Sequence, residues 1–228
     1  LSSIGTRVAI GAYLNDGNGA NSGHVRIYDY NGSAWVQVGG DIDGEGEGDG
    51  SGFSVSLSSD GSRVAIGAYS NDGTNGANSG HVRIYDYDGS AWVQVGGDID
   101  GEAENDQSGR AVSLSSDGTR VAIGAKDNDG ANGSNSGHVR IYDYNGSAWV
   151  QVGADIDGEA VNDNSGSSVS LSSDGSRVAI GAPENGGNGS SSGHVRIYDY
   201  DGSAWVQVGA DIDGEAQGDA LGYSVSLL

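Results

Sequence analysis

The sequence has no cysteine and no methionine, and only one proline and one phenylalanine. The absence of cysteine excludes a disulfide framework, a thiolate metal site and a thiol nucleophile. No apolar run approaches the length of about 18 to 20 residues that spans a bilayer. No stretch shows the 3.6-residue period of an amphipathic helix. The sequence therefore predicts an all-β chain with no membrane insertion.

Basic residues are also scarce. The chain has 10 lysine and arginine residues against 32 aspartate and glutamate residues, which gives a formal net charge of -22. A surface this negative repels phosphate backbones and anionic membranes, and it attracts cations. Nucleic acid is therefore not an expected partner.

What the sequence does contain is a repeat. The four tryptophans recur at intervals of 57, 57 and 56 residues, and so do the only four histidines: Trp35, Trp92, Trp149 and Trp205, and His24, His81, His138 and His194. Periods of this length are typical of solenoids, propellers and arrays. We expect one repeat domain over residues 1–228, with repeats at about 1–56, 57–113, 114–170 and 171–227.

Each repeat is expected to form four strands. In the second repeat these cover residues 55–58, 63–68, 81–87 and 91–96, which are rich in alternating or β-branched residues. The first and third connections are tight and contain Asp-Gly or Asn-Gly, the residues that hairpin turns favour. The other two connections run to about a dozen residues each. In an up-and-down meander both long loops emerge at one end, called here the long-loop face.

Sixteen such strands predict a β-propeller of four four-stranded antiparallel blades. The chain ends on SVSLL, which matches the first strand of the other repeats. We expect residues 224–227 to pair with residues 7–12, so that the last strand closes the first blade and hides two sheet edges. The alternative is an open segment of a longer repeat array.

The stretch SGFSVSLSSDGSRVAIGAY resembles the FG-GAP repeat, and the resemblance extends over all four repeats. That repeat builds the propellers of integrin α-subunits and of many secreted microbial surface proteins. The resemblance implies an extracellular or cell-surface propeller. Many members of the family carry an Asp-rich calcium loop at the first turn, whereas the turn SSDGSR here is short and has one carboxylate.

Carboxylates are concentrated in the loop that joins one repeat to the next. The pattern D-x-D-G-E-x-x-x-D offers four of them per loop, and alternate residues of a Gly-containing loop can converge on one hard cation. The candidate calcium ligands are Asp41, Asp43, Glu45, Asp49, Asp98, Asp100, Glu102, Asp106, Asp155, Asp157, Glu159, Asp163, Asp211, Asp213, Glu215 and Asp219. Solvated acids that keep the protein soluble give the same pattern, so both interpretations stay open.

The positions that differ between repeats lie at or beside the long-loop face. A binding surface built from loops over a rigid frame has this distribution, and so do loops under relaxed constraint. The candidate binding residues are Tyr13, Phe53, Tyr69, Arg110, Lys126 and Tyr223.

The histidines and tryptophans are expected to pack within and between blades. Serine, histidine and aspartate occupy the same place in every repeat, whereas a catalytic triad needs one unique constellation. We therefore expect no enzymatic activity.

These observations predict a module of a larger secreted or surface protein for adhesion or assembly through its acidic long-loop face, with calcium as the one candidate ion and no other cofactor. Its partner would be a protein or polysaccharide at the cell surface, or further copies of itself. A purely structural repeat of a fibre or surface layer is the first alternative. A glycan-binding lectin with one site per blade is the second.

Overall fold

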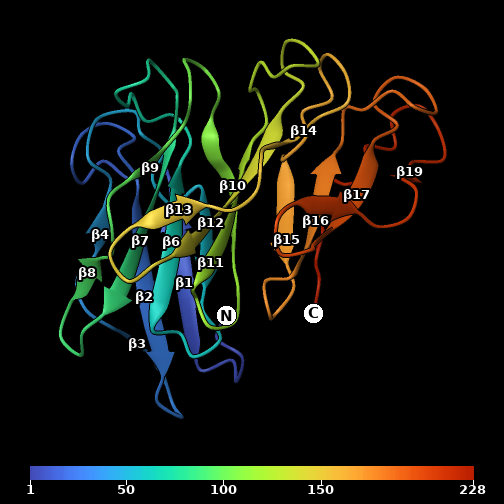
Figure 1. The fold of residues 1–228 in the computed structure, drawn as a ribbon. Helices are drawn as coiled ribbons and strands as arrows, with labels where there is room; N and C mark the ends of the chain where they lie inside the picture. Colours follow the sequence, from blue (N-terminus) through green and yellow to red (C-terminus); the bar gives the residue numbers. More distant parts are fainter.

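The computed structural model describes residues 1–228 and consists of strands, turns and loops. Its 19 strands form four antiparallel sheets, which fan out like propeller blades (Figure 1). None of its segments forms a helix long and apolar enough to cross a membrane. The predicted all-β propeller class is confirmed.

The strands occupy equivalent places in each blade. The innermost are β5 (Ser54–Leu57), β10 (Ser108–Leu114) and β15 (Ser168–Leu171); next come β1 (Arg7–Ala12), β6 (Arg63–Ala68), β11 (Arg120–Ala125) and β16 (Arg177–Ala182). The third position holds β2 (His24–Tyr30), β7 (His81–Tyr87), β12 (His138–Tyr144) and β17 (His194–Tyr200). Outermost are β3 (Trp35–Gln37), β8 (Trp92–Gln94), β13 (Trp149–Gln151) and β18 (Trp205–Gln207).

The predicted second and third strands match β6 and β7 in both bounds. The predicted fourth strand is shorter, and a two-residue strand follows it and pairs with the third strand of the blade. These short strands are β4 (Ile42–Asp43), β9 (Ile99–Asp100), β14 (Ile156–Asp157) and β19 (Ile212–Asp213). The outer edge of each blade is therefore shared by two short segments.

The hydrophobic core lies between blades. One cluster joins Val82 and Ile84 of the second blade to Val121 and Ile123 of the third. These side chains are at most 1% exposed, because both faces of an inner blade are covered by its neighbours. At the outer rim three tryptophan indoles donate to a carbonyl of the preceding blade: Trp92 to Val38 O, Trp149 to Val95 O and Trp205 to Val152 O, each at 2.9 Å. The expectation that the tryptophans fill the gap between blades is confirmed for these three, whereas Trp35 of the first blade is 47% exposed.

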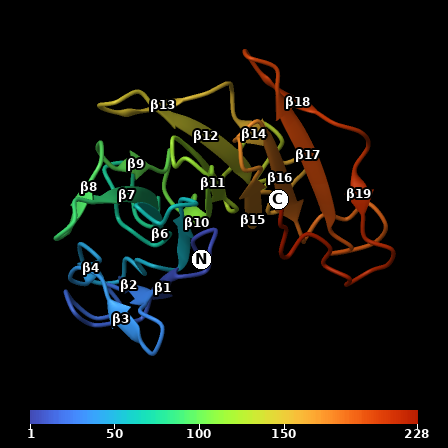
Figure 2. The ribbon, with the colours of Figure 1, turned by 90° about the horizontal axis from the view of Figure 1, so that it is seen from below.

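The predicted closure of the ring is wrong. Residues 224–227 form no strand with β1, and no paired strands join the first sheet to the fourth, which lie apart in the view along the blades (Figure 2). The terminal segment instead stays on the fourth blade, where Leu227 N donates to Ser170 Oγ at 2.9 Å. Leu114 N and Leu171 N make the same contact to the preceding blade.

Residues 224–227 stay on the fourth blade because they make the same contact with the preceding blade that Leu114 and Leu171 make. This contact forms wherever the first blade lies. The segment occupies the position of the first strand of a further blade, and one edge of β1 stays unpaired. The chain is therefore an open fan of blades, as in the alternative arrangement.

Candidate functional site

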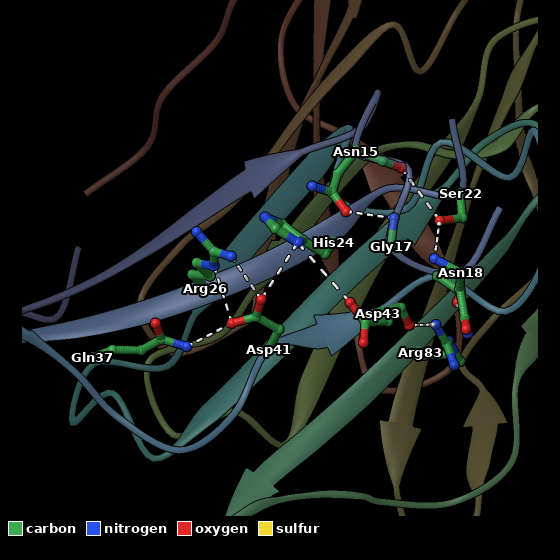
Figure 3. Close-up of polar contacts among 11 residues, drawn as sticks. Asn15, Gly17, Asn18, Ser22, His24, Arg26, Gln37, Asp41, Asp43 and Arg83 are labelled. Atoms are coloured by element: carbon green, nitrogen blue, oxygen red, sulfur yellow. Dashed lines mark hydrogen bonds and ion pairs between the residues drawn. The ribbon is translucent and has the colours of Figure 1, made fainter. Parts of the chain in front are cut away.

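The long loops are held by their own polar side chains. In the first blade Asn15 Oδ1 accepts from Gly17 N at 2.8 Å, and Asn18 Nδ2 donates to Gly44 O at 2.9 Å (Figure 3). Ser22 Oγ donates to Asn15 O at 3.3 Å. The long-loop face is thus an ordered surface that can present side chains at fixed positions.

Four of the six predicted binding residues line one hollow on this face. Its volume is about 360 Å³, and its walls come from all four repeats. The lining residues are Phe53, Arg110, Lys126, Asn164, Ser167, Pro183, Glu184 and Tyr223. Positions that vary between repeats therefore converge on one place.

The other two predicted binding residues extend the hollow as an aromatic stack. The Tyr13 and Phe53 rings meet edge to face with centroids 5.2 Å apart, and the Phe53 and Tyr69 centroids are 4.6 Å apart. The Arg110 guanidinium lies 4.0 Å from the Phe53 centroid. Such contacts fix a guanidinium over an apolar platform.

The two basic groups of the hollow differ in their pairing. Lys126 Nζ is 2.7 Å from Asp127 Oδ1, which neutralises its charge. Asn164 Nδ2 also donates to Asp127 Oδ1, at 2.8 Å, and so holds that carboxylate in place. Arg110 makes no ion pair or side-chain hydrogen bond. The hollow therefore contains one guanidinium whose donors are free for a ligand.

The carboxylates of each inter-repeat loop bind different partners. The first carboxylate of the loop accepts a hydrogen bond from the outer strand of its own blade, as Asp98 Oδ1 does from Gln94 Nε2 at 2.6 Å. In the first blade Asp41 also pairs with Arg26, whose hydrogen bond lowers the pKa of that carboxyl (Figure 3). The third reaches the next blade, as Glu45 does to Arg83 at 3.4 Å.

The last carboxylate of each of the first three loops is buried within the loop. Asp106 is 2% exposed and accepts from Ala103 N at 2.9 Å and from Asn128 Nδ2 at 3.1 Å. Asp49 and Asp163 are buried in the same way, whereas Asp219 is exposed. The second acidic residue of the first loop, Asp43, also makes a main-chain contact, since its carbonyl oxygen accepts a hydrogen bond from Arg83 Nη2 at 2.8 Å.

The four carboxylates of one loop thus do not gather into one cluster; the compact groups of candidate ligands each combine a histidine with two carboxylates. Calcium binding by these loops stays a prediction.

These groups differ from the expectation that the histidines are packing residues. The sequence does contain a signal for these groups. An arginine follows each histidine by two residues, and a Gly-Glu pair recurs in each loop between repeats. In the structure Arg140 and His138 both contact Glu102. Burial lowers the pKa of His138 to about 4 and raises the pKa of Glu102.

No protein-family model matches the sequence, and no curated protein matches it. Among solved structures, the chain is similar to a candidate 6-phosphogluconolactonase from Bacteroides fragilis, with a TM-score of 0.56 and 12% identity over 92% of this chain and 56% of that one. It is also similar to hydrazine synthase from Kuenenia stuttgartiensis, with a TM-score of 0.44 and 16% identity over 72% of this chain and 37% of that one. The chain thus spans little more than half the length of the first structure and less than half of the second.

The first of these structures corrects the expectation that the chain has no enzymatic activity. It is named as a candidate enzyme and is similar to this chain in fold, so repetition of the strands is no argument against catalysis. Catalytic groups can sit on loops that vary independently of the repeated scaffold. At these identities the likeness shows the fold alone.

Proposed function

We propose that the chain is a binding module of an extracellular or cell-surface protein of the FG-GAP kind, used for adhesion through the hollow of its long-loop face. One observation carries this proposal. Eight of the ten basic residues recur at equivalent strand positions, and the two that do not, Arg110 and Lys126, both line the hollow.

The chemistry of the hollow favours a ligand with a single carboxylate beside an apolar surface. The free Arg110 guanidinium can donate two parallel hydrogen bonds to a carboxylate, and Phe53 and Tyr223 offer aromatic contact. The net charge of -22 disfavours long polyanions. The fitting partner is therefore a protein or polysaccharide that presents a local carboxylate.

The test is binding of trisaccharides that contain one uronic acid residue and of their methyl esters, which lack the charge. We expect the acids to bind and the esters to bind at least about tenfold more weakly. Arg110→Gln should weaken binding of the acid by about the same factor, because it removes the charged donor. Titration calorimetry measures both.

The matched control is Arg177→Gln, which makes the same change near the tight turns of the fourth blade and should leave binding unchanged. Equal binding of acid and ester, or insensitivity to Arg110→Gln, would contradict the carboxylate assignment. A lectin with one equivalent site per blade has less support, since the lining residues differ between repeats.

Assembly is a second candidate function, favoured by the exposed face of the first blade. Leu1, Val8, Ile10, Tyr28 and Trp35 line an apolar hollow of about 420 Å³ there. Ile10 is 51% exposed, whereas its equivalents in the other blades are 1% exposed. Residues 224–227 have the same sequence as β5, and β1 has the same sequence as β6. Because β5 pairs with β6, residues 224–227 of a second copy could pair with β1 in the same register. Head-to-tail contact between copies would cover this face.

If copies assemble in this way, sedimentation at increasing concentration will show association. Ile10→Arg should weaken association at least about tenfold, because it places a charge in the buried contact. Val93→Arg is the control, since Val93 is 50% exposed on β8 of an inner blade. A chain that stays monomeric at the highest concentration, or equal effects of the two variants, would exclude this route.

A further inference from the structure

We propose that each of the three interfaces between adjoining blades binds a divalent transition-metal ion through one histidine and two carboxylates. In each set the glutamate comes from the loop of the preceding blade, the histidine opens the third strand, and the aspartate follows the outer strand. The three sets are Glu45, His81 and Asp98; Glu102, His138 and Asp155; and Glu159, His194 and Asp211.

The histidine of each set is buried, and in two of the three sets its Nε2 has no hydrogen-bond partner. The His138 side chain is 2% exposed, and its Nε2 has no partner, as is also true of His81. Its Nδ1 is directed at the two carboxylates. A buried imidazole facing two carboxylates is a donor set that a metal ion satisfies.

The donor separations are too long for hydrogen bonds but suit a shared ion. His138 Nδ1 lies 3.8 Å from Glu102 Oε2 and 3.9 Å from Asp155 Oδ2. In the next interface His194 Nδ1 lies 3.6 Å from Glu159 Oε2 and 4.0 Å from Asp211 Oδ2. A tetrahedral ion about 2.1 Å from each donor holds them about 3.4 Å apart. A contraction of roughly half an ångström would therefore complete the coordination.

Each carboxylate keeps one oxygen free for the ion, because its other oxygen has a partner. Glu102 Oε1 faces Arg140 Nη1 at 3.5 Å, and Asp155 Oδ1 accepts from Gln151 Nε2 at 2.6 Å. Outer partners that orient the ligands in this way are a common feature of protein metal sites. The arginine offsets part of the negative charge, so we expect modest affinity.

The nitrogen donor favours zinc, cobalt and related ions over calcium, which takes six to eight oxygen ligands. Glu102 is 44% exposed and Asp155 is 32% exposed, so water can reach the ion and fill its remaining positions.

The first blade lacks this arrangement, which supplies an internal control. No preceding loop contributes a glutamate to His24, which faces Asp41 and Asp43 instead (Figure 3). The Asp41 oxygen nearest to His24 accepts from Arg26 Nη2 at 2.8 Å. This group also has one histidine and two carboxylates, but one of its three donor atoms is already engaged by an arginine, so we expect three ions per chain rather than four.

The test is titration of the chelator-treated chain with Co²⁺, followed by calorimetry and by visible absorption, which responds to nitrogen ligation. We expect three ions per chain, displaced by Zn²⁺. His138→Ala and Glu102→Gln should each reduce the number to two, and His24→Ala should leave it at three. Glu102→Gln changes a half-exposed side chain and preserves its shape, so it tests the site even if His138→Ala fails to fold.

Absence of saturable Co²⁺ binding would overturn the proposal. So would an unchanged stoichiometry in folded Glu102→Gln. Displacement of Co²⁺ by an equal concentration of Ca²⁺ would also overturn it, because the loop carboxylates alone would then account for binding. Ligand binding at the hollow does not involve these residues, so Arg110→Gln should leave the Co²⁺ stoichiometry unchanged.

Discussion

Gly124→Ala is expected to destabilise the fold by about 3 kcal/mol or more, because overpacking of a rigid contact is costly. A Cβ at this position would overlap the carbonyl oxygen of Gly166 and lie 2.9 Å from its carbonyl carbon. The Gly166 backbone has little room to withdraw, since its N–H donates to Gly181 O at 3.1 Å. Urea unfolding followed by tryptophan fluorescence measures the loss.

The same close approach occurs wherever one blade meets the next, at Gly11, Gly67, Gly124 and Gly181. The matched control is Gly97→Ala, where a Cβ would meet nothing within 4 Å. We expect that variant to change the free energy of unfolding by at most about 0.5 kcal/mol. If both variants lose stability equally, the close contact between blades does not explain the glycine.

Arg120→Ala is expected to cost about 2 to 3 kcal/mol, since it removes charge-assisted hydrogen bonds from a largely covered site. Arg120 binds Asp143 through two nitrogens, at 2.6 and 2.7 Å, and its Nη1 donates to Gly175 O of the next blade at 2.9 Å. The guanidinium also lies 5.0 Å from the Tyr200 ring centroid. One side chain therefore ties the third blade to the fourth.

The repeat supplies the control for this experiment. Arg177 makes the same paired contact with Asp199 but reaches no further blade, and its side chain is 45% exposed. Arg177→Ala should therefore leave the melting temperature almost unchanged. Equal losses in the two variants would show that the pair within the blade, and not the contact between blades, carries the stability.

The candidate site was predictable to the extent that it depends on differences between repeats. Phe53, Arg110, Lys126 and Tyr223 stand out in the sequence because they break the repeat, and the structure gathers them around one hollow. Their convergence was not predictable, since it depends on how the blades are turned relative to one another. The histidine groups were missed for the same reason, because Glu102 and His138 are 36 positions apart and meet only when two blades pack.

The sequence by itself determined the inner strands of each blade, their order and their turns, whereas the split of the outer edge into two short strands was not predicted. Alternation places Val64 and Ile66 in the core, and Asp60-Gly61 sets the hairpin before them, with Gly61 at a φ of +73°. These features depend on local backbone preferences and on neighbouring strands. Whether residues 224–227 close the ring onto residues 7–12 was decided only in the tertiary structure. A ring closes only if the rotations from each blade to the next add up to a full turn. Each rotation is set by the packing of side chains across an interface and not by any local sequence pattern.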